Sequence, residues 1–111
     1  MEDETMTDQV QASHILLMYE GSSRSTATRS KEDALSEIQA LAKELAEGGD
    51  FEQLAVENSD CPSKTRGGDL GTFGRGQMVG AFDEVVFALE VGNTSDVVET
   101  DFGFHLIQRT G

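Results

Sequence analysis

Apolar residues recur at helical spacing between residues 31 and 47. They stand every three or four positions, at Ala34, Leu35, Ile38, Leu41, Ala42 and Leu45, which places them on one face of an α-helix. Ser30 and Asp33 before them resemble a capping box, and Gly48 and Gly49 follow them. The pattern predicts a helix over about residues 31–47 that buries one face.

Short runs of apolar and β-branched residues predict four strands. The first run spans residues 10–18, and side-chain alternation places His14 on the same face as Leu16 and Met18. The other three runs are residues 69–73, 96–100 and 104–109. Only a turn separates the last two, so we expect them to pair with each other.

Two shorter helices complete the pattern. Asp50 can cap a helix whose apolar face carries Phe51, Leu54 and Ala55, and residues 81–89 form the other. Loops rich in Gly, Ser and Thr are predicted at residues 20–30, 58–68 and 74–80. The order is strand, helix, helix, strand, helix, strand, strand, which predicts an α+β domain with a small sheet covered by helices.

Composition and charge limit the classes of function. The 111 residues suit one domain, with residues 1–9 as an acidic disordered tail and residues 10–111 as the folded part. The net charge of −13 argues against nucleic acid and anionic membranes as partners. A single cysteine excludes an internal disulfide, and neither a membrane-spanning run nor a signal peptide is present. We expect a monomer in the cytoplasm, or also in the nucleus if the source is eukaryotic.

Two histidines and one cysteine are the candidate reactive side chains. His14 and His105 lie in the first and last predicted strands, and Cys61 lies in a loop. They could be zinc ligands, although no short-spaced ligand pair accompanies them. They could form a Cys–His hydrolase site, although Asp60 and the acidic field oppose a thiolate. They could also be buried structural histidines beside an inert thiol.

A glycine-rich stretch follows the cysteine. Its spacing fits neither GxGxxG nor a P-loop, so we interpret its glycines as tight turns. Four large apolar residues surround it, which predicts core packing or a pocket wall: Leu70, Phe73, Met78 and Phe82.

Several ordered blocks of the sequence resemble one known family. They are SHILL at 13–17, FEQLAVENSDCPS at 51–63, GGDLGTFGRGQM at 67–78, FDEVVFAL at 82–89 and FGFHLIQR at 102–109. Together they resemble the parvulin-type peptidyl-prolyl cis/trans isomerases over about residues 11–111. The resemblance implies a four-stranded antiparallel sheet surrounded by helices, prolyl isomerase activity and no cofactor or metal.

The resemblance also implies roles for individual residues. His14 and His105 match the paired sheet histidines, and Thr100 matches a hydroxyl that joins them. Cys61 matches the active-site cysteine, which other members replace by Asp. The residues that match the substrate-binding group are Leu70, Met78 and Phe82, which hold the proline ring, with Phe73 as a pocket wall and Gln77 beside the pocket.

Phosphate recognition is where this chain departs from part of the family. Members that prefer phosphorylated Ser or Thr before proline carry a basic cluster that starts with Lys at the end of the first strand. Met18 stands at that position, and Arg24 and Arg29 are the remaining possible phosphate contacts. We expect an isomerase that acts non-covalently on Xaa-Pro bonds of peptides and proteins without strict need for phosphate. The alternative is a non-catalytic binding module or holdase chaperone for extended Pro-containing segments.

Overall fold

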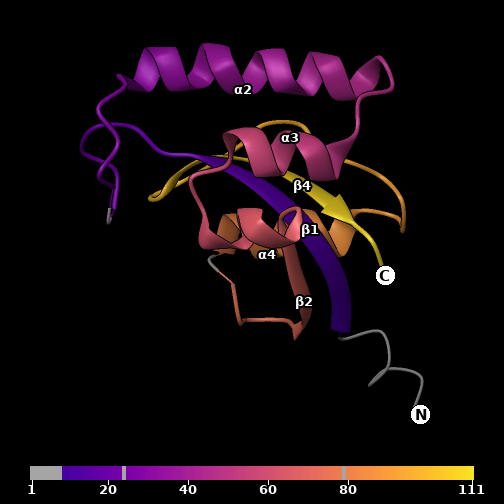
Figure 1. Cartoon of the computed structure of the whole chain (residues 1–111). Coiled ribbons are helices and arrows are strands. Elements are labelled where there is room, and N and C mark those ends of the chain that lie inside the picture. The colour runs from indigo at the N-terminus through magenta and orange to yellow at the C-terminus, as the bar shows by residue number, and fades with distance from the viewer. Residues whose placement is uncertain (1–8, 24, 79) are drawn as a thin grey trace, which may run out of the picture.

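Four antiparallel strands form one sheet in the order β2-β1-β4-β3 in the computed structural model of the chain, shown in Figure 1. The structure describes residues 9–23, 25–78 and 80–111. The strands are β1 Gln9–Leu17, β2 Asp69–Gly74, β3 Val98–Thr100 and β4 Gly103–Arg109. The first and last long strands are therefore the central pair, and the expected α+β architecture with four strands is confirmed.

Helices cover both faces of the sheet. They are α2 Lys31–Ala46, α3 Phe51–Asn58 and α4 Gly80–Ala88, with a short 3-10 helix, η1, at Pro62–Arg66. In Figure 1, α2 and α3 lie on one side of the sheet and α4 lies on the other. Among the described residues, no helix is long and apolar enough to cross a membrane.

Side-chain caps define where α2 and α3 begin. The Ser30 hydroxyl accepts a hydrogen bond from the Asp33 amide at 3.0 Å. The Asp50 carboxylate accepts one from the Glu52 amide, also at 3.0 Å. Both caps satisfy amides that the first helical turn leaves without a partner. The predicted starts of these helices are confirmed.

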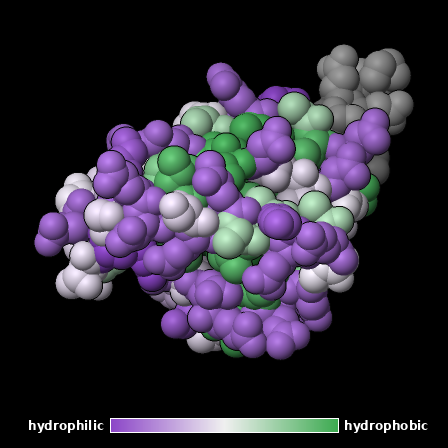
Figure 2. Space-filling model, turned by 90° about the horizontal axis from the view of Figure 1, so that it is seen from above, coloured by the Kyte–Doolittle hydropathy of each residue, from purple (hydrophilic) through white to green (hydrophobic). Residues whose placement is uncertain are grey.

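Two hydrophobic clusters lie on opposite faces of the sheet. Ile15 and Leu17 of β1 pack with α2 and α3, in a cluster completed by Phe104 and Leu106 of β4. The second cluster joins β1, β2, β4 and α4 through Val10, Ala12, Phe73, Phe82, Val86 and Ile107. Hydrophilic residues predominate on the face in Figure 2. Such a surface is expected for a small domain with a high negative charge, because charged side chains are mostly exposed.

Two details differ from the sequence prediction. Gln9 belongs to β1 instead of the acidic tail, whose residues 1–8 lie outside the described part of the chain. The loop predicted at 58–68 contains η1, which begins with Pro62. Proline suits the first turn of a helix because the missing N–H has no helical acceptor there.

Glycine is required at two places beside the central strands. At Gly68 the backbone has φ +87°, and a Cβ atom would lie 2.4 Å from the carbonyl oxygen of His14. At Gly103, with φ +142°, a Cβ atom would lie 2.3 Å from the carbonyl oxygen of Leu17. Any side chain would push these segments away from β1, so both glycines help to set the position of the strand that carries His14.

Candidate active site

One largely apolar pocket opens on the α4 face of the sheet. It collects side chains from β1, β2, β4, α4, η1 and the four segments that follow β1, α3, β2 and β3. Its lining residues are His14, Leu16, Met18, Thr26, Asp60, Cys61, Pro62, Leu70, Met78, Phe82, Phe102 and His105. Six of the predicted site residues therefore meet here, although they are spread over 91 positions of the sequence: His14, Cys61, Leu70, Met78, Phe82 and His105.

The two histidines meet because their strands are neighbours. His105 lies opposite Leu16 in the register, and His14 lies opposite Ile107, so the histidines are diagonal neighbours on one face. Their Nδ1 atoms are 3.2 Å apart. The rings stack with centroids 5.3 Å apart. A hydroxyl then extends the contact, because Thr100 Oγ1 lies 2.7 Å from Nε2 of His105.

Burial keeps both imidazoles neutral at physiological pH. It lowers the pKa of His14 to about 4. Burial, followed by the charge on His14, lowers the pKa of His105 to about 3. One of the two facing Nδ1 atoms must therefore carry a proton and donate it to the other. The tautomer of His14 thus determines the role of His105 Nε2. It donates a hydrogen bond to Thr100 if His14 Nδ1 carries the hydrogen, and accepts one from Thr100 if it does not.

Phe82 forms the floor of the pocket and touches both imidazoles. Its ring meets His14 and His105 edge to face, with centroid distances of 5.6 Å and 5.5 Å. Phe82 is only 2% exposed, whereas Leu70 and Met78 at the walls are half-buried. The three side chains give an apolar cavity next to a polar pair that is neutral, an environment with few competing hydrogen-bond partners for a peptide.

Cys61 is half-buried at the pocket edge, between Asp60 and Pro62. Asp60 is the one charged residue in the described lining, and its carboxylate accepts a hydrogen bond from Arg29 Nη1 at 2.6 Å. Neither Lys nor Arg is among the residues that line the pocket in the described part of the chain. The pocket is thus built to hold an uncharged apolar group.

Three predicted site residues lie elsewhere. Phe73 packs behind Phe82, with ring centroids 6.3 Å apart, and belongs to the core. Gln77 turns back to its own loop, where Oε1 accepts from the Gly74 amide at 2.8 Å. Arg29 is bound to Asp60 and also lies 3.6 Å from Glu37, so its guanidinium is already neutralised by carboxylates. Phe73 therefore stands behind Phe82, where a pocket wall would lie, whereas Gln77 and Arg29 are not among the described residues that line the pocket. Arg24 lies outside the described residues.

The pocket also contains residues to which the sequence analysis assigned no role in the site. Leu16 and Met18 line it, and their alternation with His14 on one strand face was the available signal. Asp60 and Pro62 flank Cys61 in sequence. Thr26 and Phe102 come from loops whose paths the chain pattern does not specify, so no local signal could have identified them.

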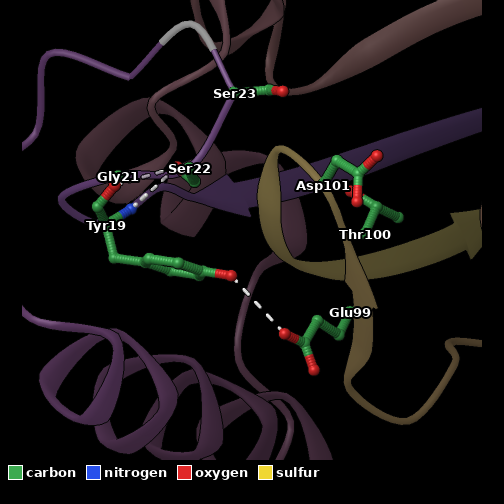
Figure 3. Close-up of a pocket in the computed structure, with 7 residues that line it drawn as sticks. All are labelled: Tyr19, Gly21, Ser22, Ser23, Glu99, Thr100 and Asp101. Atoms are coloured by element: carbon green, nitrogen blue, oxygen red, sulfur yellow. Dashed lines mark hydrogen bonds between the residues drawn. The ribbon is translucent and has the colours of Figure 1, made fainter.

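A polar hollow adjoins the site at the turn between β3 and β4. Figure 3 shows Tyr19, from the segment after β1, pointing toward Glu99, whose Oε2 lies 3.4 Å from the tyrosine hydroxyl. Lys31 Nζ lies 2.8 Å from the same carboxylate oxygen. Hydrogen bonding to Lys31 lowers the pKa of Glu99, and the same contact raises the pKa of Lys31. This lysine therefore has its own counter-ion.

No cluster of three or more His, Cys, Asp or Glu side chains suited to a metal ion exists within residues 9–23, 25–78 and 80–111. The histidine pair engages its facing nitrogens with each other and with Thr100. His14 Nε2 has no hydrogen-bond partner, but a metal ion at that nitrogen would find no cluster of three such donors in the described part of the chain.

Comparison with known proteins gives consistent matches over nearly the whole chain. The family described as PPIC-type PPIASE domain matches residues 1–111. The chain is 45% identical to "Peptidyl-prolyl cis-trans isomerase Pin1" of Digitalis lanata, over 95% of this chain and 98% of that protein. Its fold is similar to peptidyl-prolyl isomerase ESS1 from Candida albicans, with TM-score 0.87 and 36% identity over 94% of this chain and 63% of that one. The solution structure of TbPIN1 gives TM-score 0.85 and 38% identity, covering 94% and 98%.

Proposed function

Since the chain belongs to the parvulin-type peptidyl-prolyl cis/trans isomerases, we propose that it turns over Xaa-Pro bonds of peptides and proteins without needing a phosphate on the residue before proline. The observation that carries the proposal is the pocket itself. Three apolar side chains, a neutral histidine pair and a thiol meet in it, and no cation lines its described part.

The chemistry needs little more than this environment. Rotation about an Xaa-Pro bond is slow because it breaks amide resonance, with a barrier of about 20 kcal/mol. Phe82, Leu70 and Met78 offer apolar surface for the proline ring while the preceding carbonyl rotates. The twisted amide is less dipolar than the planar one, so a dry pocket favours it over the ground state. No covalent bond has to form, and Cys61 acts through its polarity at the pocket edge.

The neutral histidines suit such a mechanism. An imidazolium would bring a charge and its water into the apolar cavity, whereas the lowered pKa values keep both rings uncharged. Thr100 anchors one end of the pair, and Phe82 contacts both rings. The pair is therefore suited to hold the surroundings of Cys61 and Phe82 in one arrangement instead of transferring protons to substrate.

The surroundings of Met18 argue against a phosphate requirement. A phosphate carries close to two negative charges at neutral pH and binds best to cations that lack other partners. Here Met18, directly after β1, presents an uncharged thioether to the pocket. Arg29 is paired with Asp60, and Lys31 is paired with Glu99. A phosphate beside Met18 would also meet the Asp60 carboxylate.

Exchange NMR on matched Ser-Pro and phosphoSer-Pro peptides tests the proposal. We expect comparable turnover of both peptides, within about threefold, a difference of under 1 kcal/mol. Met18→Lys should raise turnover of the phosphopeptide selectively, because it adds a cation beside the pocket. Val91→Lys adds the same charge at a residue that is 61% exposed and not among those lining the pocket, and so provides the matched control.

The contrary outcome is equally measurable. A preference for the phosphopeptide of about a hundredfold, close to 2.7 kcal/mol, that collapses in Arg24→Ala would show a working phosphate site in the loop after β1. The control for that variant is Lys43→Ala, which removes one positive charge from the last turn of α2.

A further inference from the structure

The part of β1 that leads to the pocket has no partner strand on its β2 side. β2 pairs with β1 from Gln9 to Ser13 and goes no further. The next amide on that edge belongs to His14, and it donates to the carbonyl of Gly68, which precedes β2, at 2.9 Å. Leu16 and Met18 present the following backbone groups, and an unpartnered amide at a buried position is strongly unfavourable.

The segment directly before Cys61 takes the place of the missing strand. The Asp60 amide donates to the Leu16 carbonyl at 2.7 Å. The Ser59 hydroxyl accepts from the Leu16 amide at 3.0 Å and from the Cys61 amide at 3.3 Å. The Asp60 carboxylate then accepts from the Met18 amide at 2.9 Å. Two side chains and one amide thus continue the ladder where β2 ends.

Arg29 closes this arrangement from the other side of the chain. Its Nη1 donates to Asp60 Oδ2 at 2.6 Å and to the Met18 carbonyl at 2.9 Å. Asp60 Oδ2 therefore has two donors, and both the amide and the carbonyl of Met18 are bound. The charge-assisted bond is the strongest kind in such a network. It ties the segment before α2 to the one that carries Cys61.

We propose that Asp60 is a positioning residue for catalysis, which holds Cys61 at the pocket edge through its contacts with Met18 and Arg29. Cys61 follows it directly, and the Ser59 hydroxyl holds the Cys61 amide on the same edge. The proposal rests on the isomerase activity of the family and is independent of any preference about phosphate.

A graded set of variants tests it. Asp60→Asn keeps an acceptor for the Met18 amide and loses the charge that Arg29 requires, whereas Asp60→Ala loses both. We expect kcat to fall about tenfold in Asp60→Ala and less in Asp60→Asn, with KM within about twofold, because displacement of a group from its working geometry acts mainly on kcat. The alkylation rate of the Cys61 thiol by iodoacetamide should change in the same order. Glu37→Ala removes the other carboxylate near Arg29, at 3.6 Å, and should change neither quantity.

A double-mutant cycle separates positioning from a direct role of the carboxylate. If Asp60 acts through Cys61, the tenfold loss should shrink to about twofold or less when Asp60→Ala is made in a Cys61→Ala background. An undiminished loss in that background, or an unchanged alkylation rate in Asp60→Ala, would overturn the proposal. Full kcat in folded Asp60→Asn and Asp60→Ala would overturn it as well. Wild-type protein without isomerase activity would overturn the proposed function and leave the family assignment standing, and the alkylation series would still report whether Asp60 places Cys61.

Discussion

The two faces of the sheet differ in how completely they are sealed. On the α2 and α3 face, the cluster around Ile15, Ile38 and Leu106 consists of apolar side chains from regular elements. On the α4 face, the cluster around Phe82 is rimmed by half-buried residues such as Leu70 and Met78, and it adjoins two buried histidines. On the first face the buried cluster is wholly apolar. The other exposes part of its core to a pocket.

This difference shows where the domain places its buried polar groups and its irregular segments. The closed face is made by two capped helices, whose apolar positions the helical period dictates. The open face depends on segments without a regular period, namely η1, the loop after β2 and the turn between β3 and β4. Binding sites are commonly carried by loops held on a rigid scaffold, and the sheet with its closed face is that scaffold here.

The largest effect is expected from Phe82→Ala, which breaks the open face. The side chain is 2% exposed, so its removal should leave a cavity and lower the free energy of unfolding by about 3–5 kcal/mol. Because the ring also touches both histidines, isomerase activity of the remaining folded protein should be lost. Urea unfolding and exchange NMR on one sample measure both quantities. Full activity in folded Phe82→Ala protein would contradict the role of the ring in the pocket.

Ile38→Ala sharpens the comparison from the closed face. Ile38 has no exposed surface and lies in the cluster with α2 and α3. We expect a loss of about 2–5 kcal/mol of unfolding free energy, similar to that of Phe82→Ala. The kcat per folded molecule should stay near wild type, since the pocket is on the opposite face. A kcat that falls as far as in the Phe82 variant would show that the two faces are coupled.

Acid should lower the free energy of unfolding through the two buried histidines of the open face. Burial holds the pKa of His14 at about 4 and that of His105 at about 3, below the value of 6.5 for a free imidazole. The unfolded chain therefore binds protons that the folded chain does not. Stability is fully present above pH 6.5 and falls as the pH decreases toward these lowered values. We expect a loss of roughly 2 kcal/mol per histidine at pH 5.

Urea unfolding at pH 7 and pH 5 measures this loss, and His14→Gln should reduce it by about half because one imidazole no longer titrates. Equal stability of the wild type at the two pH values would refute the lowered pKa values. So would a folded-state imidazole titration near pH 6.5 by NMR.

Local patterns were sufficient for the elements and for part of the site. The helix at Lys31–Ala46 and its Ser30 cap follow from spacing and cap chemistry that act within a few residues. The alternation of His14 and Leu16 along β1, continued by Met18 directly after it, correctly predicted one shared face, because side chains of a strand alternate. The resemblance to the family identified the residues Cys61, Leu70, Met78 and Phe82, which the structure brings together.

The sequence by itself determined the order of elements, the closed face and the excess of negative charge, since all three depend on spacing and composition. Only the tertiary structure decided which polar groups meet. Pairing with β2 stops before Leu16 and Met18, so their backbone amides donate to the side chains of Ser59 and Asp60. The Asp60 carboxylate placed there binds Arg29, whose guanidinium therefore faces a carboxylate instead of a ligand. Gln77 likewise turns to its own loop. These hydrogen bonds join residues 3 to 43 positions apart, and their directional geometry exists only once the backbone has folded.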